Sequence, residues 1–184
     1  MKITAAEARR LSTAPLKLTA NRVWRVYQGG RLIDEMRSAP NPQDGNFPED
    51  WTASDTQALN EGREHIVEGL SQVALDDGST VALRDLLRQA PAEYLGSEHV
   101  RRYGSRLALL VKLLDSAVRL QIQAHPTPEF SRRHLNDSFG KTESWLVLDT
   151  RPINGVEPYI LLGFRERMDK PTLGDLIARQ DVAG

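Results

Sequence analysis

The sequence predicts a mainly β fold, a sandwich or barrel with helical additions. Several short runs have the alternation or apolar content of strands, and turn residues, among them 13 Gly and 10 Pro, separate these runs. Helical patterns are few and short, as in β domains that carry added helices. A chain of 184 residues can bury roughly 70% of its unfolded surface around one core, so we expect one domain over residues 1–184.

The first part of the chain predicts a hairpin, a long loop and a helix. Residues 21–36 alternate along the chain and contain a Gly-Gly pair, which favours a hairpin. Residues 37–72 are rich in Pro, Gly, Asn and Asp and are expected to form a long ordered loop. Residues 79–91 start with a Ser-Thr pair suited to an N-cap and stop at a proline, so a helix of about three turns fits. The apolar run 106–116 fits a helix or a strand by periodicity.

The second part predicts two helices and a pair of strands. Residues 126–140 suggest a turn, a short helix and a glycine stop. Residues 141–151 and 157–167 are strand candidates, joined across the hairpin signal Asn154-Gly155. Residues 170–184 have a helical pattern.

Composition excludes several classes of partner and chemistry. The 24 basic and 25 acidic residues give a net charge of -1, so no global field favours nucleic acid or an anionic membrane. The chain has no cysteine, which excludes disulfides, thiolate metal sites and cysteine nucleophiles. No segment has the roughly 18 apolar residues of a membrane span, and the N-terminal residues lack the apolar run of a secretory signal. We therefore expect a cytoplasmic protein whose anionic partner, if it has one, is small.

The segment QIQAHP, residues 121–126, has polar side chains at every second position. In a strand, Gln121, Gln123 and His125 would share one face and the residues between them the other. A strand that turns a polar face to water gives the same pattern. Lys141 and Glu143, also two residues apart, would share a face of a neighbouring strand.

Together, Gln, His and Glu offer an amide oxygen, an imidazole nitrogen and a carboxylate oxygen, a donor set that suits zinc or another first-row divalent ion.

A family resemblance rests on motifs that occur in order along nearly the whole chain. These motifs are NRVWRVYQGGRLID, FPEDWTAS, VEGLSQ, LLVKLLDSAVRLQIQAHP, FGKTESW and PYILLGF. In them the sequence resembles the type I phosphomannose isomerases, the cupin-superfamily mannose-6-phosphate isomerases. The resemblance implies a cupin-type jelly-roll β-barrel, incomplete in this chain, and a single catalytic domain that forms the N-terminal part of a longer isomerase.

The resemblance also implies the site and its reaction. Gln123, His125 and Glu143 match the family's ligands for a catalytic divalent metal, usually zinc, and Lys141 and Lys112 match polar residues of its active site. The substrate would be a sugar phosphate, because the family interconverts mannose 6-phosphate and fructose 6-phosphate by moving a proton between C1 and C2. A divalent ion can stabilise the developing oxyanion as a Lewis acid, and a lysine could serve as base, acid or oxyanion partner. Within its apolar run, Lys112 would either extend its charge to an edge or recognise an anion.

Two departures from the family pattern keep other functions open. Gln121 stands where the family usually has a small hydroxyl residue, and the family's remaining metal histidine and catalytic arginine come from a part of the barrel beyond residue 184. The alternatives are a non-catalytic metal-binding or sugar-phosphate-binding cupin and a structural or interaction domain. Strand edges exposed by an incomplete barrel would allow self-association.

Overall fold

The structure is a computed structural model that describes residues 3–181, in two compact units that meet between Asp149 and Thr150 in the chain. The helices of the first unit are α1 (Ala5–Leu11), α2 (Arg31–Met36), α3 (Leu83–Gln89), α4 (Pro91–Leu95), α5 (Ser97–Tyr103), α6 (Pro128–Phe130) and the π-helix η1 (Ser131–Leu135). Its strands are β1 (Arg22–Val23), β2 (Glu49–Thr52), β3 (Gln72–Ala74), β4 (Thr80–Ala82) and β5 (Val111–Leu114). The second unit contains α7 (Lys170–Arg179).

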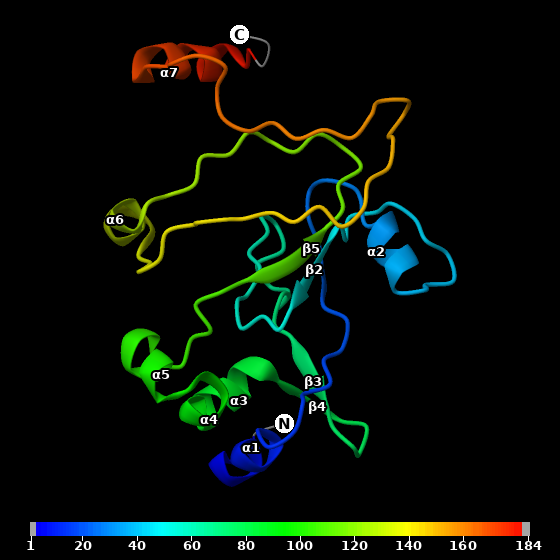
Figure 1. Cartoon of the computed structure of the whole chain (residues 1–184), viewed down its shortest axis with the longest axis vertical. Helices are drawn as coiled ribbons and strands as arrows, with labels where there is room; N and C mark the ends of the chain where they lie inside the picture. Colours follow the sequence, from blue (N-terminus) through cyan, green and yellow to red (C-terminus); the bar gives the residue numbers. More distant parts are fainter. Residues whose placement is uncertain (1–2, 182–184) are drawn as a thin grey trace. The chain divides into compact units, whose positions relative to one another are not determined.

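The first unit contains a three-stranded antiparallel sheet in the order β1-β2-β5. Strands β2 and β5 lie side by side (Figure 1). Trp51 of β2 pairs with Lys112 of β5, so these residues lie directly opposite each other. Val23 of β1, Trp51 of β2 and Ala58 are buried together in a small apolar cluster. The apolar run 106–116, which fitted either a helix or a strand, therefore contains a strand.

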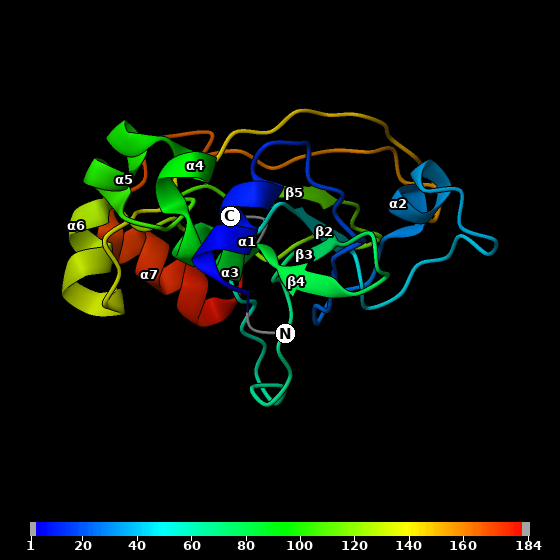
Figure 2. The same cartoon turned by 90° about the horizontal axis from the view of Figure 1, so that it is seen from below.

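The larger apolar core lies between the β3–β4 hairpin and helices α1 and α3 (Figures 1 and 2). Helix α1 begins at a capping box, in which Thr4 and Glu7 satisfy each other's backbone donors. Helix α3 turns three leucines inward. The buried members of this core are Ile3, Ala8, Val73, Val81, Leu83, Leu86, Leu87 and Ala90. Because these residues come from both ends of the segment 3–90, the core closes that segment on itself.

The hairpin predicted for residues 21–36 is wrong. The Gly-Gly pair instead leads into α2, and Gly30 is its N-cap with a φ of 103°, a left-handed conformation that favours glycine. The Asp115 carboxylate accepts hydrogen bonds from the backbone N–H groups of Gly30 (3.1 Å) and Leu32 (2.8 Å). A distant carboxylate thus satisfies the first donors of the helix, which local alternation could not reveal.

The predictions for residues 37–91 are correct in part. The segment 37–72 is mostly irregular, but it contains β2, the central strand of the sheet. A helix does end just before Pro91, yet it begins only at Leu83, because Thr80–Ala82 pairs with β3 as β4. The proline also starts α4, at a position where its missing N–H is harmless.

The strands predicted at residues 121–126, 141–151 and 157–167 are wrong: the structure has no regular strand in them. A strand needs a partner for its backbone N–H and C=O groups, and these segments have no ladder of hydrogen bonds. Their apolar side chains stay in solvent, as the exposed fractions of Leu146 (83%) and Leu162 (92%) show. The described residues therefore contain small antiparallel sheets and several helices, without a closed barrel.

Three other predictions for the second part are confirmed. Asn154 and Gly155 make a turn with positive φ angles, closed by the bridge between Ile153 and Val156. A short helix, α6 with η1, occupies part of residues 126–140, although it ends at Asn136 rather than at the glycine. The helix predicted for residues 170–184 is α7, and its last predicted positions, 182–184, lie outside the described residues.

Candidate functional site

Three of the predicted site residues come together in the first unit. The Nε2 atom of His125 lies 3.5 Å from Oε2 of Glu143, and Nζ of Lys141 lies 3.3 Å from Oε1 of the same carboxylate. The exposed fractions of these side chains are 33% for His125, 22% for Glu143 and 46% for Lys141. An imidazole, a carboxylate and an ammonium group thus form one half-exposed cluster, although neither segment is a strand.

The backbone explains how these two segments meet. The N–H group of Lys141 donates to the carbonyl oxygen of Pro126 (3.0 Å), which joins the residue after His125 to the start of the segment that carries Glu143. Gly140 makes this approach close, because a Cβ atom there would lie 2.7 Å from the Pro126 carbonyl oxygen. The absence of a side chain at Gly140 is therefore a condition for the cluster.

The separation of the His125 and Glu143 donors suits a divalent cation. Zinc bonds of about 2.1 Å at tetrahedral angles place two ligand atoms roughly 3.4 Å apart, close to the observed 3.5 Å. Lys141 contacts the other carboxylate oxygen, so Oε2 of Glu143 remains on the imidazole side. These residues fit a mixed nitrogen and oxygen site for zinc or a similar ion.

Gln123, the third predicted ligand, is exposed and makes no hydrogen bond to any residue that the structure describes. It lies two residues before His125 on the same segment. Residues 3–181 contain no group of three His, Asp or Glu side chains suited to a metal ion. The protein groups assembled so far are therefore one nitrogen and one carboxylate.

Lys112 belongs to a second cluster, around the buried carboxylate of Glu49. The Lys112 Nζ atom lies 3.5 Å from Oε1 of Glu49, and Nε of Arg25 lies 3.2 Å from the same oxygen. The hydroxyl of Tyr27 donates to Oε1 at 2.5 Å, and Nε1 of Trp51 donates to Oε2 at 2.7 Å. Two cations and two neutral donors thus surround one carboxylate whose side chain is only 4% exposed.

The sheet produces this arrangement directly. Glu49 and Trp51 are two residues apart on β2, and Lys112 lies opposite Trp51 on β5. The guanidinium of Arg25 also covers the Trp51 ring, with Cζ 5.0 Å from the ring centroid. The charge of Lys112 within its apolar run is therefore satisfied by an internal carboxylate.

The surroundings of Glu49 set the protonation of two groups. Burial acts most strongly and opposes ionisation of Glu49, but the Tyr27 hydrogen bond, the Lys112 charge, the Trp51 hydrogen bond and the Arg25 charge together lower its pKa. Burial, and then the hydrogen bond to Glu49, raise the pKa of Tyr27 far above its ordinary value. Glu49 is thus held ionised and Tyr27 is held as a neutral donor.

Sequence reasoning did not assign Glu49, Tyr27 or Arg25 to a site. A signal for Glu49 was available, because a lysine in an apolar strand needs a counter-charge. Tyr27 and Arg25 could not be found in this way, since their approach depends on the backbone between β1 and α2, which does not form the predicted hairpin.

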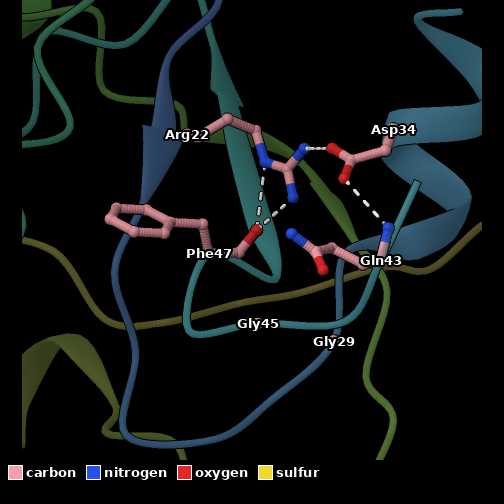
Figure 3. A pocket seen from close by; sticks show the side chains of 6 residues that line it. All are labelled: Arg22, Gly29, Asp34, Gln43, Gly45 and Phe47. Atoms are coloured by element: carbon pink, nitrogen blue, oxygen red, sulfur yellow. Dashed lines mark hydrogen bonds and ion pairs between the residues drawn. The ribbon is translucent and has the colours of Figure 1, made fainter. Parts of the chain in front are cut away.

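A cavity of about 430 Å³ lies beside the guanidinium of Arg22 (Figure 3). That guanidinium forms an ion pair with Asp34 and donates to the Phe47 carbonyl oxygen. Gln43 also contributes its backbone N–H to Asp34, at 3.4 Å. The Arg22 charge is therefore used to join β1, α2 and the loop before β2, and it does not define a ligand site.

The remaining histidines do not join either cluster. His99 Nε2 forms a hydrogen bond with the Arg106 carbonyl oxygen (2.8 Å), and the His134 ring packs on Phe130 with centroids 4.6 Å apart. His65 is exposed. Across residues 3–181, no helix has the length and apolarity needed to cross a membrane.

Comparison with known proteins identifies a family that part of this chain matches. Residues 64–141 match the family model for the type I phosphomannose isomerase catalytic domain. The resemblance predicted from the sequence is thereby confirmed for residues 64–141. The matched range contains four of the five predicted site residues, and Glu143 follows two positions after its end.

Particular relatives match over shorter segments. The chain is 42% identical over 48 residues to the probable mannose-6-phosphate isomerase GmuF of Bacillus subtilis (strain 168). This alignment covers 26% of this chain and 15% of that protein. The chain is also 44% identical over 46 residues to the mannose-6-phosphate isomerase ManA of the same strain. That alignment covers 25% of this chain and 15% of ManA. The alignments thus span less than a sixth of each relative's length. No solved structure matches the chain.

Proposed function

We propose that this chain carries the metal-binding and proton-transfer residues of a mannose-6-phosphate isomerase, on a cupin-type scaffold. The substrate would be a sugar phosphate, interconverted between mannose 6-phosphate and fructose 6-phosphate. The observation that carries this proposal is the family match over residues 64–141, which includes His125 and Lys141. Residues 1–184 would act as one catalytic domain.

The metal site would use the side chains of His125, Glu143 and Gln123. The separation of 3.5 Å between the imidazole nitrogen and the carboxylate oxygen supports this assignment, and Gln123 would complete the protein ligands through its amide oxygen. Zinc or another divalent ion bound there would stabilise negative charge on the sugar oxygens as a Lewis acid.

The two lysines would serve different roles. Lys141 lies beside the metal carboxylate and is nearly half exposed, so its ammonium group can reach a substrate and exchange a proton at C1 or C2. Lys112 shares the single Glu49 carboxylate with Arg25, so this cluster keeps a net positive charge. With an exposed side-chain fraction of 24%, Lys112 would present that charge to a substrate anion.

Metal analysis of two matched variants tests the metal assignment. His125→Ala should lose most of the zinc that the wild-type chain retains after dialysis, because the imidazole ligand of the proposed site is removed. His65→Ala is the matched control, since His65 is exposed and has no partner among the described residues. Equal zinc content in the two variants would contradict the assignment.

A coupled assay for fructose 6-phosphate separates an isomerase from a protein that only binds metal. Lys141→Met should retain zinc and lose turnover, because it removes a proton-carrying group and leaves the imidazole and carboxylate in place. A metal-loaded wild-type chain without turnover would favour a non-catalytic binding protein.

A further inference from the structure

We infer that a polar cavity between α3 and two neighbouring loops binds a small tetrahedral dianion of the phosphate class. The cavity measures about 360 Å³, within the usual range for ligand sites. Its lining residues are Asp55, Thr56, Gln57, Arg84, Arg88, Ser105 and Arg106. None of these is a residue of the metal or proton-transfer sites proposed above, so this inference does not rest on the proposed function.

Helix α3 explains why two of the arginines face the cavity together. Its leucines at positions 83, 86 and 87 are buried in the main core. Arg84 and Arg88 are four residues apart, one turn of a helix, and both line the cavity. Two like charges at this spacing repel each other, so an anion between them would relieve an unfavourable contact.

The guanidinium groups have few partners within the protein. Arg84 donates through Nε to the Asp55 carbonyl oxygen (2.9 Å), and its terminal nitrogens have no partner among residues 3–181. Arg88 makes no hydrogen bond or ion pair with any described residue. Arg106 forms a long ion pair with Asp137, in which NH1 lies 3.5 Å from Oδ1. Donors suited to an anion are therefore available on at least two of the three arginines.

The position of the third arginine is fixed by its surroundings. The Arg106 carbonyl oxygen is bonded to His99, and its guanidinium lies over the Phe139 ring at 4.8 Å. The next residue, Leu107, donates its backbone N–H to Oδ2 of Asp55 at 3.0 Å. The loop that carries Arg106 is thus held against the loop that carries Asp55, and residues of both loops line the cavity.

The balance of charge selects the class of ligand. Three guanidinium groups and one carboxylate line the cavity, so its lining carries an excess of positive charge. The Asp55 carboxylate is already bonded to Leu107, which reduces its availability to a cation. Planar guanidinium forks match the oxygen pairs of a phosphate, and a dianion neutralises the lining better than a monoanion does. Ser105 and Thr56 add hydroxyl groups that can donate to further oxygens.

Titration calorimetry with inorganic phosphate at pH 8 tests the site on the full chain. Arg88→Gln should weaken binding at least about tenfold, because it removes charge-assisted hydrogen bonds. Its thermal stability should match that of the wild type, since Arg88 is exposed and has no hydrogen bond or ion pair to a described residue. Arg9→Gln changes the charge equally on an exposed residue of α1 that does not line the cavity, and it should leave the affinity unchanged.

Two further arms identify the ligand and the place of binding. Lys112→Met should retain phosphate binding. If this variant instead loses binding while Arg88→Gln binds fully, the anion lies at the proposed catalytic site and the inference is overturned. Acetate should not compete with phosphate, and equal competition at the same ionic strength would overturn the assignment to a dianion. Among the phosphate-class ligands, tighter binding of methyl phosphate than of inorganic phosphate would identify a phosphate ester as the natural ligand. Absence of phosphate binding to the wild-type chain would also refute the site.

Discussion

Replacing Glu49 by glutamine removes one negative charge from the centre of a buried cluster and changes its shape little. The two cations nearest to it, Arg25 at 3.2 Å and Lys112 at 3.5 Å, lose their counter-charge. The amide oxygen can still accept from Tyr27, but the amide nitrogen then faces the Trp51 N–H, which is also a donor.

The expected loss of stability follows from these contacts. Hydrogen bonds to charged groups contribute about 1.5–3 kcal/mol, and an unsatisfied buried donor costs about 1–3 kcal/mol. Arg25 and Lys112 keep part of their hydration, with exposed side-chain fractions of 18% and 24%, which reduces the penalty for their lost partner. We therefore expect Glu49→Gln to lower the free energy of unfolding by about 2–4 kcal/mol.

Urea denaturation at pH 7 measures this change. With a slope of about 2 kcal/mol/M, the midpoint should move down by about 1–2 M. Glu93→Gln is the matched control, because Glu93 is an exposed residue of α4, and its midpoint should stay within about 0.25 M of the wild type. An equal shift in the two variants would refute the role of Glu49 as the centre of a buried network.

The pH dependence provides a second test of the same residue. The pKa of Glu49 is lower in the folded chain than its ordinary value of 4.5, so its ionisation stabilises the fold above that value. This contribution is lost as the pH falls through the lowered pKa. The difference in stability between wild type and Glu49→Gln should thus be full at pH 7 and shrink below about pH 4.5. A constant difference down to pH 3 would show that the charge is not responsible.

Three further variants probe other features. Tyr27→Phe should lower stability by about 1.5–3 kcal/mol in urea denaturation, since it removes a hydrogen bond to an ionised carboxylate; an unchanged midpoint would contradict that bond. Gly140→Ala should reduce zinc retention and cost about 1–3 kcal/mol through the clash with Pro126, whereas Gly45→Ala, which meets nothing within 4 Å, should do neither. Leu146→Glu should weaken concentration-dependent association in sedimentation velocity without loss of stability, because Leu146 is 83% exposed. If the variant associates as strongly as the wild type, self-association does not use this segment.

The elements that could be predicted from sequence are those specified by local chemistry. The turn at Asn154-Gly155 requires positive φ angles that these two residues tolerate, and α7 begins at the Asp169 cap. Such signals act within a few residues. They do not depend on how the remainder of the chain folds.

The wrongly predicted strands would depend on segments elsewhere in the chain. Alternation in residues 121–126 indicates which side chains would share a face only if a neighbouring strand supplies the hydrogen bonds. The apolar content of residues 141–151 likewise indicates a tendency to be buried. Burial occurs only where another part of the protein packs against the segment. The structure gives neither segment a ladder of hydrogen bonds, so both remain irregular.

The candidate site shows the same division. The sequence motifs predicted His125, Lys141 and Glu143 as neighbours, and the structure brings these three together through an irregular backbone rather than through adjacent strands. The sequence did not predict that Lys112 is held by Glu49, because these residues are far apart in the chain and meet only through the β2–β5 pairing.

The hydrogen bond from Lys141 to Pro126 closes a loop that contains α6 and η1. Closing a loop of this length costs little more conformational entropy than closing one half as long, because the cost rises only with the logarithm of the length. The two segments joined by this bond are close in the chain, so we expect the imidazole and the carboxylate to meet before distant strands have paired. A cation that bound this pair would then act as a local cross-link and favour the closed loop over its open forms.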